Sequence, residues 1–339
     1  MEMITSNLNV IWFVLIFILF AGFFVLEGFD YGLGILLPII GKTDVERRQM
    51  INSIGPVWDG NEVWMITAGG AMFASFPHVY ATLFSGFYLA LFLMLAALII
   101  RGVSFEFRSK DPAPAWRKTF DYCIFFGSFI PALLWGITVG NLIQGTPIDA
   151  NKHFVGGFFD LLSVYTLLCG LAFILVFVYH GALYVSIKTT GAIAERARAT
   201  ALVEGVFVAI GAIALVVATY VYTDLFKSTL ATVAFSLAIL CFLVSWAFTR
   251  VRKPGMGFVF SCLMIIMIVG AYFAGLFPRI MVSSLNPEWS LTITNASSSP
   301  YTLTLMTIVA CLFVPIILCY QAWVYITFRK RVDEKDLHY

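Results

Sequence analysis

Long apolar segments separated by short polar connections recur along the whole chain of 339 residues. A helix rises about 1.5 Å per residue, so roughly 20 apolar residues cross a hydrocarbon core of about 30 Å. Nine segments meet this requirement: residues 8–36, 56–76, 79–100, 119–142, 158–187, 201–222, 229–249, 257–277 and 303–327. The pattern predicts an all-α polytopic membrane protein with nine transmembrane helices, in a single integral-membrane domain over residues 1–339.

Basic residues gather in alternate connections between these segments. If the N-terminus is outside, 18 of the 21 lysines and arginines fall on the inner side; they are Lys42, Arg47, Arg48, Arg101, Arg108, Lys110, Arg117, Lys118, Lys188, Arg196, Arg198, Arg250, Arg252, Lys253, Arg329, Lys330, Arg331 and Lys335. Positive charge marks cytoplasmic loops of membrane proteins, so the asymmetry predicts an N-out/C-in topology. An eight-helix arrangement would place one basic cluster on the wrong side.

Composition excludes a soluble domain, because 60% of the residues are hydrophobic and only 12% are charged. The six cysteines all lie in apolar segments and form no CxxC pair, so we interpret them as small buried side chains. The four histidines are scattered along the chain. A metal or haem bound by this chain alone is therefore not supported, and His180 is expected to be a hydrogen-bonded histidine of the helix bundle.

Two acid pairs stand out in the first two segments: Glu27 with Asp30, and Asp59 with Glu62. Each pair has i,i+3 spacing, and the two segments run in opposite directions, so we expect all four carboxylates in the cytoplasmic half. Ionisable groups inside a membrane are costly and usually functional, which favours proton handling. The alternative is that Asp59 and Glu62 only stabilise a helix N-terminus that begins near Pro56. Both interpretations stay open at this point.

A charged connection follows the third segment, over residues 101–111. It contains Glu106 and Lys110, which could collect protons at the cytoplasmic surface. A solvated polar loop is the more ordinary interpretation.

Several motifs together resemble subunit II of cytochrome bd-type quinol oxidases. They are EGFDYGLG at 27–34, RRQMINSI at 47–54, PVWDGNEVW at 56–64, TAGGA at 67–71, FSGFY at 84–88, FRSK at 107–110, GNLIQG at 140–145 and FVFSC at 258–262. The matches cover essentially the whole chain, and the combination of the WDGN block with the other blocks is highly specific.

The resemblance implies a fold of nine helices, arranged as two four-helix bundles plus one peripheral helix. It implies a multi-pass protein of the bacterial cytoplasmic membrane that pairs with subunit I, in part through the small residues 69–71. Subunit I of that family carries two haems b, the haem d and the quinol site, whereas subunit II carries none of these. The resemblance further implies a role in electrogenic quinol oxidation by oxygen. A structural quinone, a small accessory membrane subunit and bound lipid occur in some members.

The family's proposed proton route transfers to Asp59 in the WDGN block, with Trp58 and Asn61 as supporting residues and Glu106 and Lys110 nearer the entrance. Glu62, Glu27 and Asp30 join this candidate route through their position. Two departures concern the details of the route: Val57 stands where some members have histidine, and Glu106 stands where others have aspartate. The outer loop 278–301 is also shorter than in several relatives. The alternative function is a proton-coupled secondary transporter, although the acids lie to one side and no paired broken helices appear.

Overall fold

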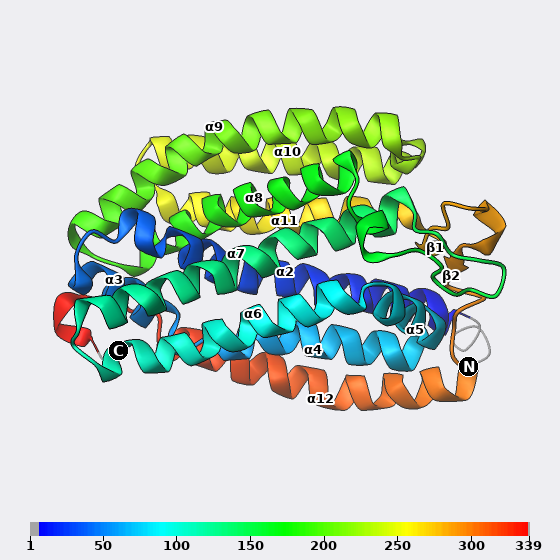
Figure 1. Cartoon of the computed structure of the whole chain (residues 1–339), viewed down its shortest axis with the longest axis horizontal. Coiled ribbons are helices and arrows are strands. Elements are labelled where there is room, and N and C mark those ends of the chain that lie inside the picture. Colours follow the sequence, from blue (N-terminus) through cyan, green and yellow to red (C-terminus); the bar gives the residue numbers. More distant parts are fainter. Residues whose placement is uncertain (1–6, 338–339) are drawn as a thin grey trace.

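The computed structural model describes residues 7–337, and most of them are helical (Figure 1). The long elements are α2 (Leu8–Ile40), α3 (Asp44–Ile54), α4 (Trp58–Ser75), α5 (Pro77–Gly86), α6 (Tyr88–Phe107), α7 (Pro114–Gln144), α8 (Val164–Lys188), α9 (Gly191–Tyr222), α10 (Thr229–Arg250), α11 (Pro254–Leu276) and α12 (Pro300–Thr327). Short 3-10 turns connect them: η1 (Arg108–Lys110), η2 (Phe158–Leu161), η3 (Leu225–Lys227), η4 (Pro287–Trp289) and η5 (Glu334–Asp336).

Eight of the described helices are long and apolar enough to cross a membrane: α2, α6 with η1, and α7 to α12. The helix α4 has 18 residues and is not among them. Its first turns carry Asp59, Asn61 and Glu62, which interrupt its apolar character. It nevertheless lies along α2, as the second predicted segment requires.

The predicted third segment, residues 79–100, is wrong in its bounds. The helical structure is interrupted at Phe87, between α5 and α6. The helix α6 then continues to Phe107 and into η1. Residues 101–110 are therefore helical rather than the predicted loop. The reason is that the buried face of α6 continues past the apolar run, through Arg101, Ser104 and Phe105. An arginine on that face is tolerated because buried carboxylates pair with it.

Smaller corrections concern the central helices. The helix α9 begins at Gly191, ten residues before the predicted start at 201, and α8 begins at Val164 because residues 158–161 form the 3-10 turn η2. A side-chain cap explains the start of α8, and an amphipathic first part explains the early start of α9. Ser163 caps α8 by accepting a hydrogen bond from Thr166 N, and the early part of α9 is amphipathic, with Ile193 and Ala197 buried.

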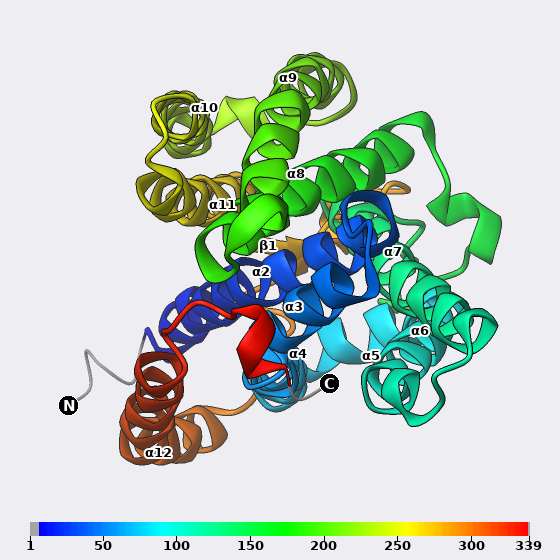
Figure 2. The ribbon, with the colours of Figure 1, turned by 90° about the vertical axis from the view of Figure 1, so that its left-hand side faces the viewer.

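The helix α2 lies at the centre of the molecule, against α4, α7, α8 and α11. The helices α8 to α11 pack together on one side of it, and α4, α6 and α7 pack on the other (Figure 2). The helix α12 lies at the edge, against α2 and α4, and Leu303 is its one buried residue in the described part of the chain. The start of α2 and the end of α12 lie at opposite ends of the long axis (Figure 1).

The loop after α11 is a packed cap and not merely a polar connection. It forms a two-stranded antiparallel sheet from β1 (Arg279–Met281) and β2 (Leu291–Thr292), and it buries Ile293 and Ala296. Ser298 N donates to Ser75 O at 2.8 Å, which ties the cap to the end of α4.

Candidate functional site: a buried charge cluster between α2, α4 and α6

A fully buried arginine occupies the centre of the charge cluster. Arg101 of α6 forms ion pairs with Glu27 of α2 and, at 3.1 Å between Nη1 and Oε1, with Glu62 of α4. Its guanidinium carbon lies 4.9 Å from the centroid of the Tyr31 ring and 5.4 Å from that of Phe105. One cation therefore joins three helices through two carboxylates and two aromatic faces.

Close helix packing positions this arginine. Gly127 of α7 faces α6, and a Cβ atom there would lie 2.6 Å from the Cβ of Arg101. Glycine therefore allows α6 and α7 to approach at this level. At this level Arg101 is shielded from bulk solvent, with an exposed fraction of 0%.

A hydrogen-bonded chain extends the cluster towards α12. Asn61 Nδ2 donates to Asp30 Oδ2 at 2.7 Å, and the Tyr325 hydroxyl donates to Asn61 Oδ1 at 2.8 Å. Asp30 is fully buried, as is Glu27. The contact of Asn61 with Asp30, together with the Arg101 bridge between Glu27 and Glu62, brings α2 and α4 together at this level.

The remaining predicted residues lie at the surface of this chain. Asp59, Glu106 and Lys110 are all exposed, so Asp59 does not share the buried face that holds Glu62. The rings of Trp58 and Phe105, which directly precede Asp59 and Glu106, contact each other at 5.1 Å between centroids. The predicted site residues thus form two sets. One set is buried around Arg101, and the other, Asp59, Glu106 and Lys110, is exposed at neighbouring helix ends.

The buried set contains more carboxyl groups than cations. Glu27, Asp30 and Glu62 face one guanidinium, and Glu62 alone retains some exposure, at 21% of its side chain. A buried ion pair offsets its desolvation cost only when it is well paired, so the cluster depends on Arg101. Carboxyl groups that share one cation in a low-dielectric site are suited to exchange protons.

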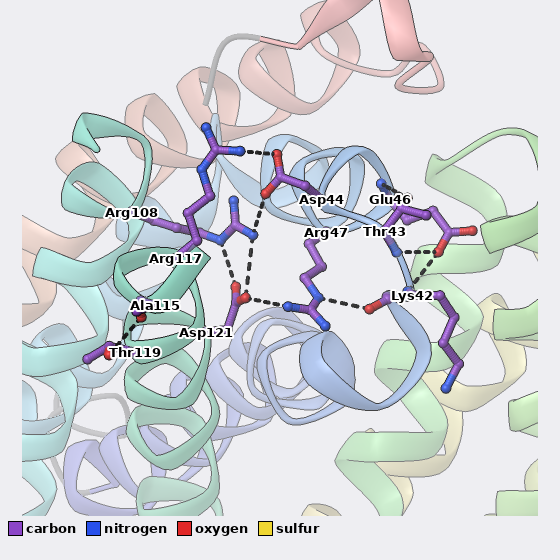
Figure 3. A network of polar contacts seen from close by, with 11 residues as sticks. Lys42, Thr43, Asp44, Glu46, Arg47, Arg108, Ala115, Arg117, Thr119 and Asp121 are labelled. Carbon is purple, nitrogen blue, oxygen red and sulfur yellow. Dashed lines mark hydrogen bonds and ion pairs between the residues drawn. The ribbon is translucent and has the colours of Figure 1, made fainter. Parts of the chain in front are cut away.

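A second polar network lies between α3, η1 and α7 (Figure 3). Asp121 of α7 is 1% exposed and accepts from Arg108 Nε at 2.6 Å and from Arg47 Nη1 at 2.7 Å. Asp44, at the start of α3, binds Arg108 and Arg117. The network therefore ties α3, η1 and α7 together just beyond the buried cluster.

His180 is a hydrogen-bonded bundle histidine, as predicted. Its Nδ1 lies 2.7 Å from Ser261 Oγ and its Nε2 lies 3.0 Å from Val25 O, so both ring nitrogens have protein partners. His78 and His153 are exposed, and His338 lies outside the described residues. Within residues 7–337 no group of three or more His, Cys, Asp or Glu side chains could hold a metal ion.

An apolar cavity of about 660 Å³ lies beside the cluster, between α2, α4, α5, α6, α7 and α11. Aromatic and aliphatic side chains line it, including Phe24, Met65, Leu98, Trp135 and Phe273. Trp135 connects the two features, because its ring lines the cavity and its indole N–H lies near the Tyr31 hydroxyl.

Sequence reasoning missed the two arginines that organise these networks. Arg101 and Arg108 were assigned to a solvated loop because they follow an apolar run. A signal was present: residues 94, 97, 101, 104, 105 and 108 continue one helical face at three- and four-residue spacing.

These features define a class: a polytopic membrane protein with buried ion pairs between its first helices. The family of cytochrome bd terminal oxidase subunit II matches residues 8–328. The chain is 41% identical over 335 residues to cytochrome bd ubiquinol oxidase subunit 2 of Bacillus subtilis, covering 98% of both chains. It is 39% identical over 365 residues to cytochrome bd-I ubiquinol oxidase subunit 2 of Escherichia coli K12, covering 97% of this chain and 96% of the relative.

A solved bd oxidase structure from Geobacillus thermodenitrificans has the same fold, with a TM-score of 0.76 at 15% identity over 95% of this chain and 98% of that one. The chain belongs to the family of cytochrome bd terminal oxidase subunit II. It is a multi-pass protein of the bacterial cytoplasmic membrane that pairs with subunit I in a quinol oxidase complex containing haem. The transporter alternative is thereby set aside.

Proposed function

We propose that this subunit conducts protons from the cytoplasm towards the oxygen-reducing site of its partner. The observation that carries the proposal is the burial of Arg101 between Glu27 and Glu62. Reduction of oxygen to water consumes protons, and a bilayer offers them no spontaneous path. The route begins at the exposed residues Asp59, Glu106 and Lys110, leads to the Arg101–Glu27 pair with Glu62 in an assisting role beside it, and reaches Asp30.

Two observations support this order. Glu62 is the one carboxyl of the cluster that is both partly exposed and bound to Arg101, so it links the surface with the interior. The contact between Trp58 and Phe105 places the helix ends carrying Asp59 and Glu106 side by side. Asp59 is exposed in this chain, so subunit I must cover it for Asp59 to act as a desolvated relay.

The substitution Asp59→Asn tests the proposal because it keeps the volume and removes the titrating group. We expect the complex to assemble with its haems while quinol oxidase turnover falls at least tenfold, about 1.4 kcal/mol of barrier. Asp111→Asn, another exposed cytoplasmic carboxyl, is the matched control and should keep normal turnover. Normal turnover of Asp59→Asn would place the relay elsewhere, and loss of haem would make Asp59 a structural residue.

We further propose nine membrane spans with the N-terminus outside and the C-terminus inside, arranged as two four-helix bundles plus the peripheral α12. In this topology α4 is a span in addition to the eight apolar helices and is the second span in chain order. Its position along α2 supports this assignment. A membrane-impermeant thiol reagent should label Ser298→Cys and not Lys335→Cys when it is added from outside. Labelling of both positions from outside would contradict the topology.

Subunit I supplies all haems in this proposal, and this chain contributes no haem ligand. The bonded ring nitrogens of His180 support it. A Cβ atom on Gly60, Gly69 or Gly70 of α4 would meet no other atom within 4 Å, so helices of subunit I could approach α4 closely there. The chain expressed alone should give no stoichiometric haem signal in a reduced-minus-oxidised spectrum, and such a signal would contradict the proposal.

The apolar cavity would accommodate a structural quinone. Its volume and its aromatic walls, such as Phe24, Phe273 and Trp135, fit an apolar isoprenoid group, which would add packing and no chemistry of its own there. The exposed apolar surface of α12 offers a site for lipid or for a small accessory subunit. Quinone extracted from the purified complex in excess of the quinol site would support the first of these assignments, and its absence would oppose it.

A further inference from the structure

Buried polar atoms without a protein partner are concentrated in one part of the molecule. Within the described residues, ten buried side-chain nitrogen or oxygen atoms make no hydrogen bond. Seven of the ten belong to the cluster or to its neighbours on α7: Glu27 Oε2, Asp30 Oδ1, Tyr31 OH, Arg101 Nε, Arg101 Nη2, Ser128 Oγ and Trp135 Nε1. The unpartnered atoms are thus a local property of the cluster and its neighbours.

The seven atoms include both donors and acceptors. The free oxygens of Glu27 and Asp30 can only accept while the acids are ionised, whereas the free nitrogens of Arg101 and Trp135 can only donate. They come from α2, α6 and α7, and each of them is buried without a hydrogen-bond partner. Within a membrane, leaving so many groups unsatisfied costs far more than one bound water molecule.

We propose that this pocket binds ordered water molecules that bridge the free donors of Arg101, Tyr31 and Trp135 to the free oxygens of Glu27 and Asp30. Water is the ligand that fits, because one molecule both donates and accepts and a buried water commonly has two to four polar partners. Tyr31 and Trp135 illustrate the geometry. Both polar groups are buried, and neither the Tyr31 hydroxyl nor the Trp135 indole N–H has a hydrogen-bond partner among the protein atoms.

The water site deepens the proposed function, and its role in proton transfer rests on that proposal. Bound water would connect the Arg101–Glu27 pair with Asp30 without movement of the helices. It would also extend the polar region to Trp135, whose ring forms the wall of the apolar cavity. Trp135 would then separate the hydrated pocket from the cavity.

A cryo-EM map of the complete oxidase at a resolution that shows water is the direct test. We expect density for at least one water at roughly 2.7–3.2 Å from an Arg101 nitrogen and also from a free oxygen of Glu27 or Asp30. Direct pairing of these groups, or a side chain of subunit I in their midst, would overturn the inference.

A pair of matched variants gives an independent readout. Tyr31→Phe and Tyr179→Phe each delete one fully buried hydroxyl, and the Tyr179 hydroxyl has a known partner, Ser245 Oγ at 2.8 Å. If water satisfies Tyr31, both variants lower the unfolding temperature of the complex, because each loses a hydrogen bond. If Tyr31 is truly unsatisfied, Tyr31→Phe raises the unfolding temperature while Tyr179→Phe lowers it, and the inference fails.

Neither test depends on the proton route. Water density together with normal turnover of Asp59→Asn would retain the hydrated pocket and reject the proposed route. Loss of turnover in Asp59→Asn together with a pocket that contains no water would retain the proposed route and reject the hydrated pocket.

Discussion

Tyr325 of α12 donates a 2.8 Å hydrogen bond to Asn61 Oδ1 of α4 and so joins the outermost helix to the buried charge cluster. Trp64 and Gln321 form a second polar contact between the same helices, at 2.8 Å. Since Leu303 is the one buried residue described on α12, such contacts contribute much of its attachment to the chain.

Tyr325→Phe should therefore destabilise the complex by about 1–2 kcal/mol, because it leaves the Asn61 oxygen buried without a donor. Thermal unfolding of the purified complex measures the effect. Tyr320→Phe is the matched control on the same helix, since the Tyr320 side chain is largely exposed. Equal effects of the two substitutions would contradict a specific role for the Tyr325 hydroxyl.

Arg101→Gln removes the one cation that faces Glu27 and Glu62. We expect a loss of about 3–5 kcal/mol, because a buried carboxylate would remain without a partner. The amount of assembled, haem-containing complex in the membrane reports this loss, and the exposed Arg252→Gln should leave it unchanged. Adding Glu27→Gln to Arg101→Gln should restore part of the assembly; no restoration would argue against a charge-based role.

Asp121→Asn should be destabilising by a similar amount, about 3–5 kcal/mol, because Arg47 and Arg108 would lose a shared and fully buried anion. Glu195→Gln provides the comparison. It removes an exposed i,i+3 ion pair with Arg198, which is worth about 0–1 kcal/mol. Thermal unfolding of the two variants separates the predictions, and a small effect of Asp121→Asn would show that the network of Figure 3 is dispensable.

Hydropathy and charge were sufficient to predict the membrane class, and they located eight of the long helices to within a few residues at most boundaries. They failed where polar residues share a buried helical face, because desolvation is then offset by partners distant in sequence. Arg101 pairs with Glu27 across 74 positions, and a single sequence contains no signal for that contact. The same limitation applies to Asp59 and Glu62: i,i+3 spacing suggested one shared face, whereas the packing of α2 and α6 buries only the second.

Glu46, in the first turn of α3, makes the stability of this part of the protein dependent on pH. A hydrogen bond from Arg196 holds the pKa of Glu46 below its ordinary value of 4.5, with help from the backbone N–H groups of Lys42 and Thr43 and against the effect of burial. A folded-state pKa below the unfolded value means that the stabilisation is present above about 4.5 and is lost as the pH falls through the folded pKa. Glu46→Gln should thus be less stable than wild type at neutral pH, and the difference should shrink in acid. Unfolding temperatures of the two proteins, measured from neutral to acidic pH, test this prediction. A difference that stays constant with pH would contradict the stabilising role of the Glu46 carboxylate.

Glu62→Gln should reduce turnover less than Asp59→Asn does. The Glu62 side chain is 21% exposed and is the outer of two carboxylates on Arg101, whereas Glu27 is fully buried. The glutamine keeps the volume and can still accept a hydrogen bond from Arg101, and Glu27 still balances its charge. We therefore expect a loss of less than tenfold, under about 1.4 kcal/mol, against at least tenfold for Asp59→Asn. Oxygen consumption with quinol, normalised to haem content, measures the turnover of both variants. If Glu62→Gln falls as far as Asp59→Asn with its haem intact, Glu62 is itself an obligatory carrier, and the route from the surface to Arg101 passes through its carboxyl group.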